Sequence, residues 1–123
     1  MIDIKIVIKA HSILIEQFGG SKGIRNQEGL EAAVARPFMT FDAVELYPEP
    51  IDKAAAIFES LIINHPFIDG NKRIAYLMLR LFLLESGKDI TASQDQKYSM
   101  TIAASKGELK INDIRDWIIL HLK

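Results

Sequence analysis

Hydrophobic residues recur at helical spacing over most of the chain. In the first segment, apolar or semi-polar side chains stand at positions 4, 7, 8, 11, 14, 15 and 18, the spacing of one helical face. Isoleucines also alternate over residues 2–8, as in a strand, but the helical pattern is longer and therefore favours a helix. Asp3 is placed to cap the start of this helix, and Gly19 and Gly20 to end it.

Further helices follow from the same spacing and from residues that start or stop helices. The second helix covers residues 30–36 and is ended by Pro37, and the third covers residues 53–64, capped by Asp52 and ended at His65-Pro66. The fourth covers residues 74–85, with Gly87 as its C-cap, and the fifth is opened by a capping box at 93–96 and stopped at Gly107. The last helix is capped by Asn112, and its inward face carries Ile114, Trp117, Ile118 and Leu122. Residues 21–29 are expected to form a loop.

The segment 74–85 is apolar on nearly every side, which predicts a central helix wrapped by others. Residues 37–50 have proline at both ends and mixed polarity between them, which predicts an ordered loop or a small hairpin. We therefore predict one all-α domain over residues 1–123, with about six helices around a buried central helix.

Composition excludes several classes of function. The 123 residues carry 15 Lys and Arg against 16 Asp and Glu, a net charge of -1 that argues against direct nucleic-acid binding. The absence of cysteine excludes disulfides, thiol nucleophiles and zinc-thiolate sites. The longest apolar run, residues 74–84, is interrupted by Arg80 and is shorter than the roughly 20 residues of a membrane span. The start shows no signal-peptide pattern, so we expect a cytoplasmic protein without membrane contact.

The sequence HPFIDGNKR, residues 65–73, concentrates reactive side chains between two apolar helices. Gly70 and Asn71 favour a turn, so Lys72 and Arg73 fall in the first turn of the helix that follows. The helix dipole disfavours cations there by about 0.3–1 kcal/mol, whereas it favours a bound anion. Free backbone N–H groups, two cations and a glycine together indicate a phosphate site.

His65 and Asp69 supply what phosphoryl or nucleotidyl transfer also requires. His65 is a candidate base for the attacking hydroxyl, Asp69 a candidate Mg²⁺ ligand, and Phe67 a candidate buried anchor of the turn. Each has a structural alternative: His65 as a helix-end cap, Asp69 as a turn-former, Asn71 as an N-cap and the two cations as solvated side chains. The functional interpretation depends on all of them falling within nine residues.

This motif resembles the signature H-x-F-x-[DE]-G-N-G-R-x-x-R of the Fic/Doc superfamily. The Doc (death-on-curing) branch has lysine at the position of Lys72. The segments GGSKGIRNQEGLEAAVARP and YPEPIDKAAAIFESLIINHPF also resemble Doc sequences in order and spacing. The resemblance implies a Fic fold whose active loop joins two core helices, with a flap at residues 38–47 that positions the target.

The resemblance also implies roles for the motif and partners for the protein. His65 is the base, Phe67 the anchor and Asp69 the Mg²⁺ carboxylate, while Gly70, Asn71, Lys72 and Arg73 bind the phosphates of ATP. Doc toxins phosphorylate a hydroxyl of elongation factor Tu, stop protein synthesis and are inhibited by a Phd-like antitoxin. No Ser/Thr-x-x-x-Glu-Gly/Asn inhibitory helix is found, so we expect inhibition by a separate chain.

Two positions depart from the Fic pattern and argue against nucleotide transfer. Lys72 stands where Fic enzymes have glycine, and Tyr76 where they have a second arginine that binds phosphate. We therefore expect a Doc-like kinase that transfers the γ-phosphoryl group of ATP. The alternatives are a Fic-type nucleotidyl transferase that uses the same His65, and a degenerate Fic-fold module that only binds a partner.

Overall fold

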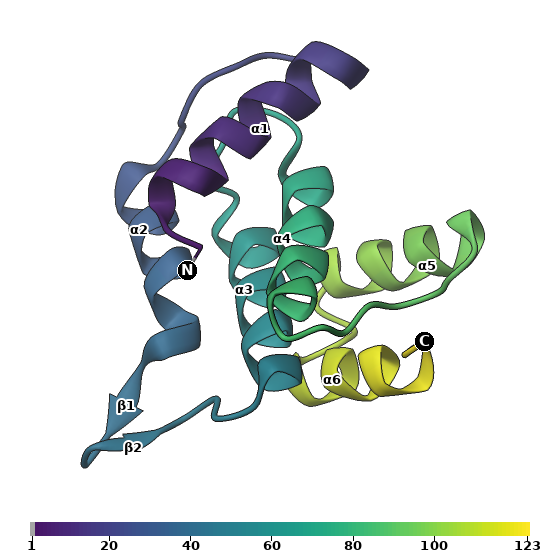
Figure 1. Cartoon of the computed structure of the whole chain (residues 1–123). Helices are drawn as coiled ribbons and strands as arrows, with labels where there is room; N and C mark the ends of the chain where they lie inside the picture. The colour runs from purple at the N-terminus through teal and green to yellow at the C-terminus, as the bar shows by residue number, and fades with distance from the viewer. Residues whose placement is uncertain (1) are drawn as a thin grey trace.

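The computed structural model describes residues 2–123, which form an all-α fold with one short hairpin (Figure 1). The elements are α1 (Ile4–Phe18), α2 (Gln27–Ala35), a 3-10 turn η1 (Arg36–Phe38), β1 (Thr40–Phe41), β2 (Val44–Glu45), α3 (Pro50–Asn64), α4 (Asn71–Glu85), α5 (Gln94–Ser105) and α6 (Ile111–Leu120). The predicted fold class and the small hairpin are confirmed. Within the described residues, no helix is long and apolar enough to cross a membrane.

α1 begins and ends where its sequence predicts. The Asp3 carboxylate accepts a hydrogen bond from the Ile6 N–H at 3.0 Å, and Gly19 ends the helix at a φ of 85°. The buried face carries Val7, His11 and Ile15. The predicted positions Ile8 and Phe18 are exposed instead, so the buried stripe is narrower than the sequence pattern.

Three helix starts differ from their predictions because another residue provides the cap. α2 begins at Gln27 rather than residue 30, since the Asn26 side chain accepts a hydrogen bond from the Gly29 N–H at 3.0 Å. α3 begins at Pro50, and Asp52 lies inside its first turn, where it accepts from the Glu49 N–H at 3.3 Å. Asn112 likewise lies inside α6, whose N-cap is Lys110. The carboxylate of Asp113 accepts the Lys110 N–H at 2.9 Å.

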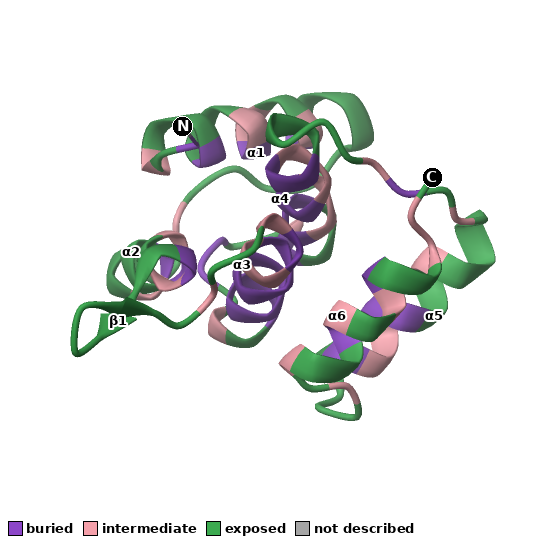
Figure 2. Cartoon of the chain, turned by 60° about the horizontal axis from the view of Figure 1, so that its bottom comes forward, coloured by how far each residue is buried: buried purple, intermediate pink, exposed green. Residues whose placement is uncertain are grey.

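The central helix is α3, not the predicted segment 74–85. Every residue of α3 from 54 to 62 is buried, and the helix packs against α2, η1, α4, α5 and α6 (Figures 1 and 2). Three consecutive alanines let its neighbours approach closely. α4 packs mainly on α3 and α1 and leaves Leu84 exposed, because it lies at one side of the bundle.

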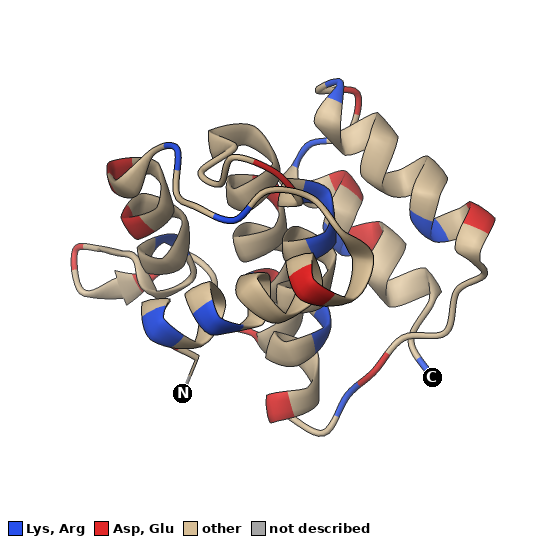
Figure 3. Ribbon diagram, turned by 90° about the horizontal axis from the view of Figure 1, so that it is seen from above, with Lys and Arg blue, Asp and Glu red and all other residues tan. Residues whose placement is uncertain are grey.

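The hairpin projects from the helical body as an exposed flap. Thr40 pairs with Glu45 and Phe41 with Val44, and the turn between them has positive φ values at Asp42 and Ala43. Phe41 is 72% exposed, so the flap presents apolar surface to solvent (Figure 2). Lys and Arg are interspersed with Asp and Glu along the ribbon when the molecule is seen from above (Figure 3).

Candidate active site

The residues of HPFIDGNKR lie together on the turn that joins the end of α3 to the start of α4. His65 is the C-cap of α3 in the left-handed conformation, with φ 49° and ψ 54°, and donates its N–H to the Leu61 carbonyl oxygen at 3.2 Å. Gly70 is the N-cap of α4 with φ 74°, a conformation that favours glycine. The side chain of His65 is exposed, so a substrate can reach it.

Asn71 organises the turn from inside. It is only 4% exposed, and its Oδ1 accepts the Phe67 N–H at 2.9 Å while its Nδ2 donates to the Phe67 carbonyl oxygen at 2.9 Å. The same Nδ2 lies 3.1 Å from Nδ1 of His65. The Asn71 side chain is thus committed to the turn, and its backbone N–H is among the first of α4, which have no carbonyl partner within the helix.

Phe67 is buried at 1% exposure, as its predicted role as anchor requires. Its ring stacks on His11 of α1, with ring centroids 3.7 Å apart and an interplanar angle of 8°. His11 Nε2 donates to the Asp69 carbonyl oxygen at 2.7 Å. Helical spacing predicts that His11 lies on the inward stripe of its helix, but no local pattern indicates this contact, which joins residues 58 positions apart.

Asp69 shapes the turn and remains accessible. Its Oδ1 accepts the Gly70 N–H at 2.9 Å, and its Oδ2 accepts the Ser21 N–H at 3.3 Å. A Cβ on Gly20 would lie 2.7 Å from Oδ2, so glycine at position 20 allows the loop to approach the carboxylate. The structural alternative for Asp69, a turn-former, is therefore present in the geometry, beside free lone pairs that face solvent.

The donor set fits Mg²⁺ only together with nucleotide phosphates. No group of three His, Asp or Glu residues that could hold a metal exists among residues 2–123. Asp69 offers one exposed carboxylate, and Mg²⁺ in phosphoryl-transfer sites is commonly held by one or two carboxylates plus phosphate oxygens and water. The site can thus hold Mg²⁺ when a nucleotide supplies the remaining ligands.

The start of α4 carries positive charge without compensation in its first turn. No acidic residue lies in that turn, and Lys72 and Arg73 are both exposed. Arg73 stacks over the exposed ring of Phe18 at 4.7 Å, which orients its guanidinium. Within the described chain, the side chain of Lys72 has no hydrogen bond or ion pair. Two exposed cations therefore stand in the first turn of α4, beside its first N–H groups.

Tyr76 does not take the place of the missing arginine. Its hydroxyl oxygen is buried and has no hydrogen-bond partner among residues 2–123. Burial raises the pKa of Tyr76, so its hydroxyl stays neutral. The Lys97 ammonium of α5 lies 5.5 Å from the centre of the ring, which places Tyr76 between α4 and α5 rather than at the turn.

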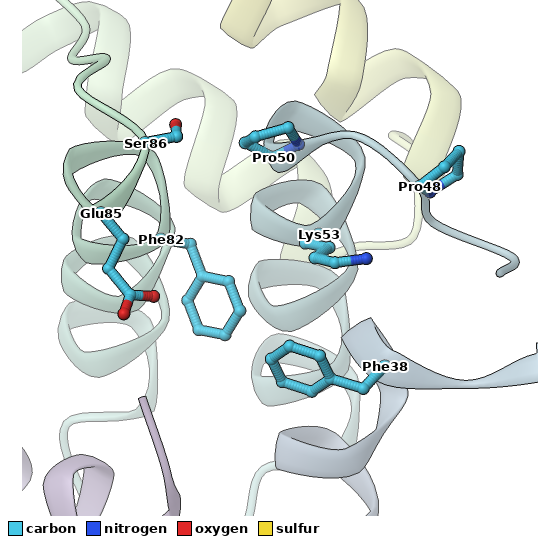
Figure 4. Close-up of a pocket in the computed structure, with 7 residues that line it drawn as sticks. All are labelled: Phe38, Pro48, Pro50, Lys53, Phe82, Glu85 and Ser86. Atoms are coloured by element: carbon cyan, nitrogen blue, oxygen red, sulfur yellow. The ribbon is translucent and has the colours of Figure 1, made fainter. Parts of the chain in front are cut away.

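A cavity of about 390 Å³ lies between the flap and the end of α3. Its lining includes Asn64, which directly precedes the turn of residues 65–73, called the active turn below. The lining also includes Met39 and Leu46 of the flap region and Ile63 of α3. A second cavity, of about 410 Å³, lies at the opposite ends of α3 and α4, where Phe38, Lys53 and Phe82 meet (Figure 4). Of these two cavities, only the first lies at the end of α3 that carries His65.

Arg36 holds the base of the flap against α3. Its Nη1 donates to Glu59 at 2.8 Å and to the Ser60 hydroxyl at 3.0 Å, and its Nε donates to the Tyr47 hydroxyl at 3.0 Å. Burial alone would lower the pKa of Arg36, but the bonds to Glu59 and Tyr47 raise it overall, so the guanidinium stays charged. No local pattern in the sequence indicates these contacts of Arg36.

Comparison with known proteins agrees with this geometry. The model of the Fic/DOC family matches residues 1–83. Toxin Doc from Mycolicibacterium smegmatis is 43% identical over 94 residues, which cover 76% of this chain and 70% of that protein. Protein adenylyltransferase fic-1 from Caenorhabditis elegans is 44% identical over 46 residues, and that from Caenorhabditis briggsae is 46% identical over 39 residues. These stretches cover 37% and 32% of this chain but only 9% and 8% of the two adenylyltransferases. The resemblance seen in the motif is confirmed, and the chain belongs to the Fic/DOC family.

Proposed function

We propose that this chain is a Doc-like toxin that transfers the γ-phosphoryl group of ATP to a protein hydroxyl. The observation that carries the proposal is the composition of the active turn. An accessible imidazole, an exposed carboxylate and a cationic helix start stand within one turn between α3 and α4. Similarity to Toxin Doc over most of the chain supports the toxin part of the proposal.

The proposed reaction exchanges one phosphorus–oxygen bond for another. The target hydroxyl oxygen bonds to the γ-phosphorus, the bond from that phosphorus to the β–γ bridging oxygen breaks, and ADP leaves. His65 takes the proton of the hydroxyl. The N–H groups at the start of α4, with Lys72 and Arg73, bind the phosphate oxygens and stabilise their charge. Mg²⁺ on Asp69 would neutralise part of the phosphate charge when bound.

Lys72 and Tyr76 favour phosphoryl over nucleotidyl transfer. The hydroxyl that the fixed base deprotonates attacks whichever phosphorus the turn holds next to it. With lysine in place of glycine, the turn has less room for a polyphosphate to run past it, and Tyr76 offers no guanidinium for the far phosphates. The terminal phosphate is then the one that reaches His65.

The target and the inhibitor are inferred from the same family. We propose elongation factor Tu as the target, with the segment that bears the hydroxyl docked beside the exposed flap and its cavity. We also propose a Phd-like antitoxin on a separate chain, whose disordered tail folds as a helix on this apolar surface. Co-purification from the native host should recover a small partner. A chain that is free of partners and harmless to its host would contradict this part.

Labelled ATP tests the proposed reaction directly. The protein is incubated with elongation factor Tu and ATP labelled at either the γ- or the α-phosphate, with Mg²⁺. Transfer of the γ-label alone is expected, and His65→Ala should reduce it by about 10²–10⁴-fold. Expression of the wild type, but not of His65→Ala, should arrest bacterial growth. Equal toxicity of a folded His65→Ala variant would exclude His65 from the chemistry.

Nucleotidyl transfer is the second candidate, and the short similarity to proteins named adenylyltransferases favours it. In that case the α-label, and not the γ-label, appears on the target. A protein that transfers neither label but still binds a partner would fit the degenerate module. The same experiment therefore separates the three alternatives.

A further inference from the structure

The end of α3 is capped by a side chain from a distant part of the chain. Arg25 lies in the loop between α1 and α2, 40 residues before His65. Its Nε and Nη2 donate to the His65 carbonyl oxygen at 2.9 and 2.6 Å, and Nη2 also donates to the Asn64 carbonyl oxygen at 3.2 Å. The guanidinium therefore holds His65 by its main-chain carbonyl oxygen, whereas the imidazole Nδ1 lies 3.1 Å from Nδ2 of Asn71.

His65 needs this support because its backbone conformation is strained. Its φ of 49° and ψ of 54° lie in the left-handed region, which a residue with a Cβ seldom adopts without help from its surroundings. The carbonyl groups at a helix C-terminus also carry partial negative charge, which a cation stabilises. Arg25 meets both needs at the residue where α3 ends.

The whole loop follows the active turn in the opposite direction. The N–H groups of Arg25 and Asn26 donate to the Pro66 carbonyl oxygen at 2.7 and 3.0 Å, and Ile24 forms an antiparallel bridge with Phe67. The Ile68 N–H donates to the Gly23 carbonyl oxygen at 3.0 Å, and the Ser21 N–H donates to the Asp69 carboxylate at 3.3 Å. Most of these contacts are between backbone atoms, which any sequence could make. Arg25 is the member of the loop whose side chain contacts the residue that carries the base.

We propose that Arg25 is a positioning residue: it keeps His65 in the left-handed conformation, and so keeps the imidazole where the attacking hydroxyl meets it. Its catalytic consequence rests on the proposed phosphoryl transfer, whereas its effect on the conformation of His65 does not. The competing explanation is that this exposed arginine binds the nucleotide. Its bonds go to carbonyl groups at the α3 side of the turn, whereas Lys72 and Arg73 lie at the α4 side.

Three variants test the proposal. Arg25→Ala removes all three side-chain bonds, and Arg25→Lys keeps the charge with a single donor nitrogen. Lys22→Ala is the matched control, because Lys22 is a cation of the same loop that pairs with Glu16 at 2.8 Å rather than with the turn. The first measurement is the ¹³Cα and ¹³Cβ chemical shift of His65 in labelled protein, which reports its backbone conformation without any activity. The second is kcat and KM for ATP.

The His65 shifts should move away from left-handed values in Arg25→Ala, move less in Arg25→Lys and stay unchanged in Lys22→Ala. With the base misplaced, kcat of Arg25→Ala should fall by about 10²-fold while KM for ATP stays unchanged. Recovery of part of kcat in Arg25→Lys is expected. If Arg25→Ala does not fold, Arg25→Lys against Lys22→Ala gives the same comparison.

Unchanged His65 shifts in a folded Arg25→Ala protein would overturn the proposal. So would a rise in KM with kcat retained, because that pattern belongs to a nucleotide ligand. If the wild type transfers no phosphate, the proposed function fails, and the chemical shifts alone still decide whether Arg25 positions His65.

Discussion

Replacing His11 by phenylalanine would separate the two contacts through which α1 supports the active turn. The His11 ring stacks on Phe67 with centroids 3.7 Å apart, and its Nε2 donates to the Asp69 carbonyl oxygen at 2.7 Å. Phenylalanine retains an aromatic ring for the stack and loses the donor. Because Asp69 is exposed, water can replace part of the lost bond. We therefore expect His11→Phe to lower the free energy of unfolding by about 1 kcal/mol.

His11→Ala removes the ring as well. The aromatic stack contributes roughly 0.5–1.5 kcal/mol beyond the area it buries. A cavity would also form around a position that is only 3% exposed in the wild type. The total should be about 3 kcal/mol, which is near the lower end for removal of a buried aromatic side chain. The difference between the two variants, about 2 kcal/mol, then measures the packing of His11 apart from its hydrogen bond.

Urea denaturation measures both values, and hydrogen–deuterium exchange of the amides at residues 69–71 shows where the effect falls. His121→Phe is the matched control, because His121 stacks on Trp117 at 4.1 Å and its Nδ1 donates to the Trp117 carbonyl oxygen at 2.8 Å, both within the C-terminal part of the chain. It should cost a similar free energy without faster exchange at residues 69–71. If His11→Phe is as stable as the wild type and as well protected there, the hydrogen bond to Asp69 contributes nothing. A cost equal to that of His11→Ala would instead refute the role of packing.

Three other changes have defined outcomes. Asparagine at position 69 can still accept the Gly70 N–H, so Asp69→Asn should change the free energy of unfolding by only about 1 kcal/mol. Its γ-phosphoryl transfer should fall by about 10²-fold, because the carboxylate proposed to hold Mg²⁺ is lost. Full activity at ordinary Mg²⁺ would leave only the turn-forming role. Tyr76→Phe removes a buried hydroxyl without a partner among the described residues, and should raise the free energy of unfolding by up to about 1 kcal/mol in thermal or urea denaturation. The hydrogen bond from Arg80 lowers the pKa of Asp89 in the folded protein. The pair therefore stabilises the fold at pH values above the ordinary carboxyl pKa of about 3.9, and this stabilisation is lost as the pH falls through the lower pKa of the folded protein. Asp89→Asn should therefore cost up to about 1 kcal/mol at pH 7 and nothing at strongly acidic pH; an equal cost at both would show that charge is not involved.

Local signals in the sequence predicted most of the elements, because a helix end is determined by a few adjacent residues. The Asp3 cap and the Gly19 stop of α1 stand where expected, and the capping box at 93–96 opens α5. Prediction was wrong where two residues competed for one cap. At α3 and α6 the carboxylate three residues into the segment bonds back to the N-cap N–H, which places the start earlier than the first good capping residue suggests.

The identity of the central helix was misjudged for a different reason. Large apolar residues on every side of 74–85 favoured that segment, whereas α3 carries alanine at 54, 55 and 56. Small side chains contribute little to a hydrophobic pattern, yet they allow α2, α4, α5 and α6 to pack on one helix. Burial all round can therefore come from alanine as well as from leucine.

The residues of the active turn were recognisable because they are consecutive, whereas its supports were not. His11 and Arg25 contact the turn across 58 and 40 residues, and no local pattern links such positions. The inward stripe of α1 did indicate that His11 is buried, which is as far as helical spacing can reach. A buried histidine needs a hydrogen-bond partner, and that requirement is a reason to look for a distant carbonyl group.

The proposal that a terminal phosphate is transferred draws support from Arg73 and Tyr76, which lie on the same helix with different neighbours. Arg73 stacks over Phe18 of α1, so its guanidinium is held near the turn. Tyr76, one helical turn further, is directed toward Lys97 of α5, and an arginine there would have to leave that contact to reach a phosphate. The third cation of α4, Arg80, pairs with Asp89, so the positive charge without an acidic partner lies in the first turn, where Lys72 stands in place of the glycine of the Fic pattern. A cradle this short matches one terminal phosphate next to His65 better than it matches an extended polyphosphate, and for this reason we favour phosphoryl transfer.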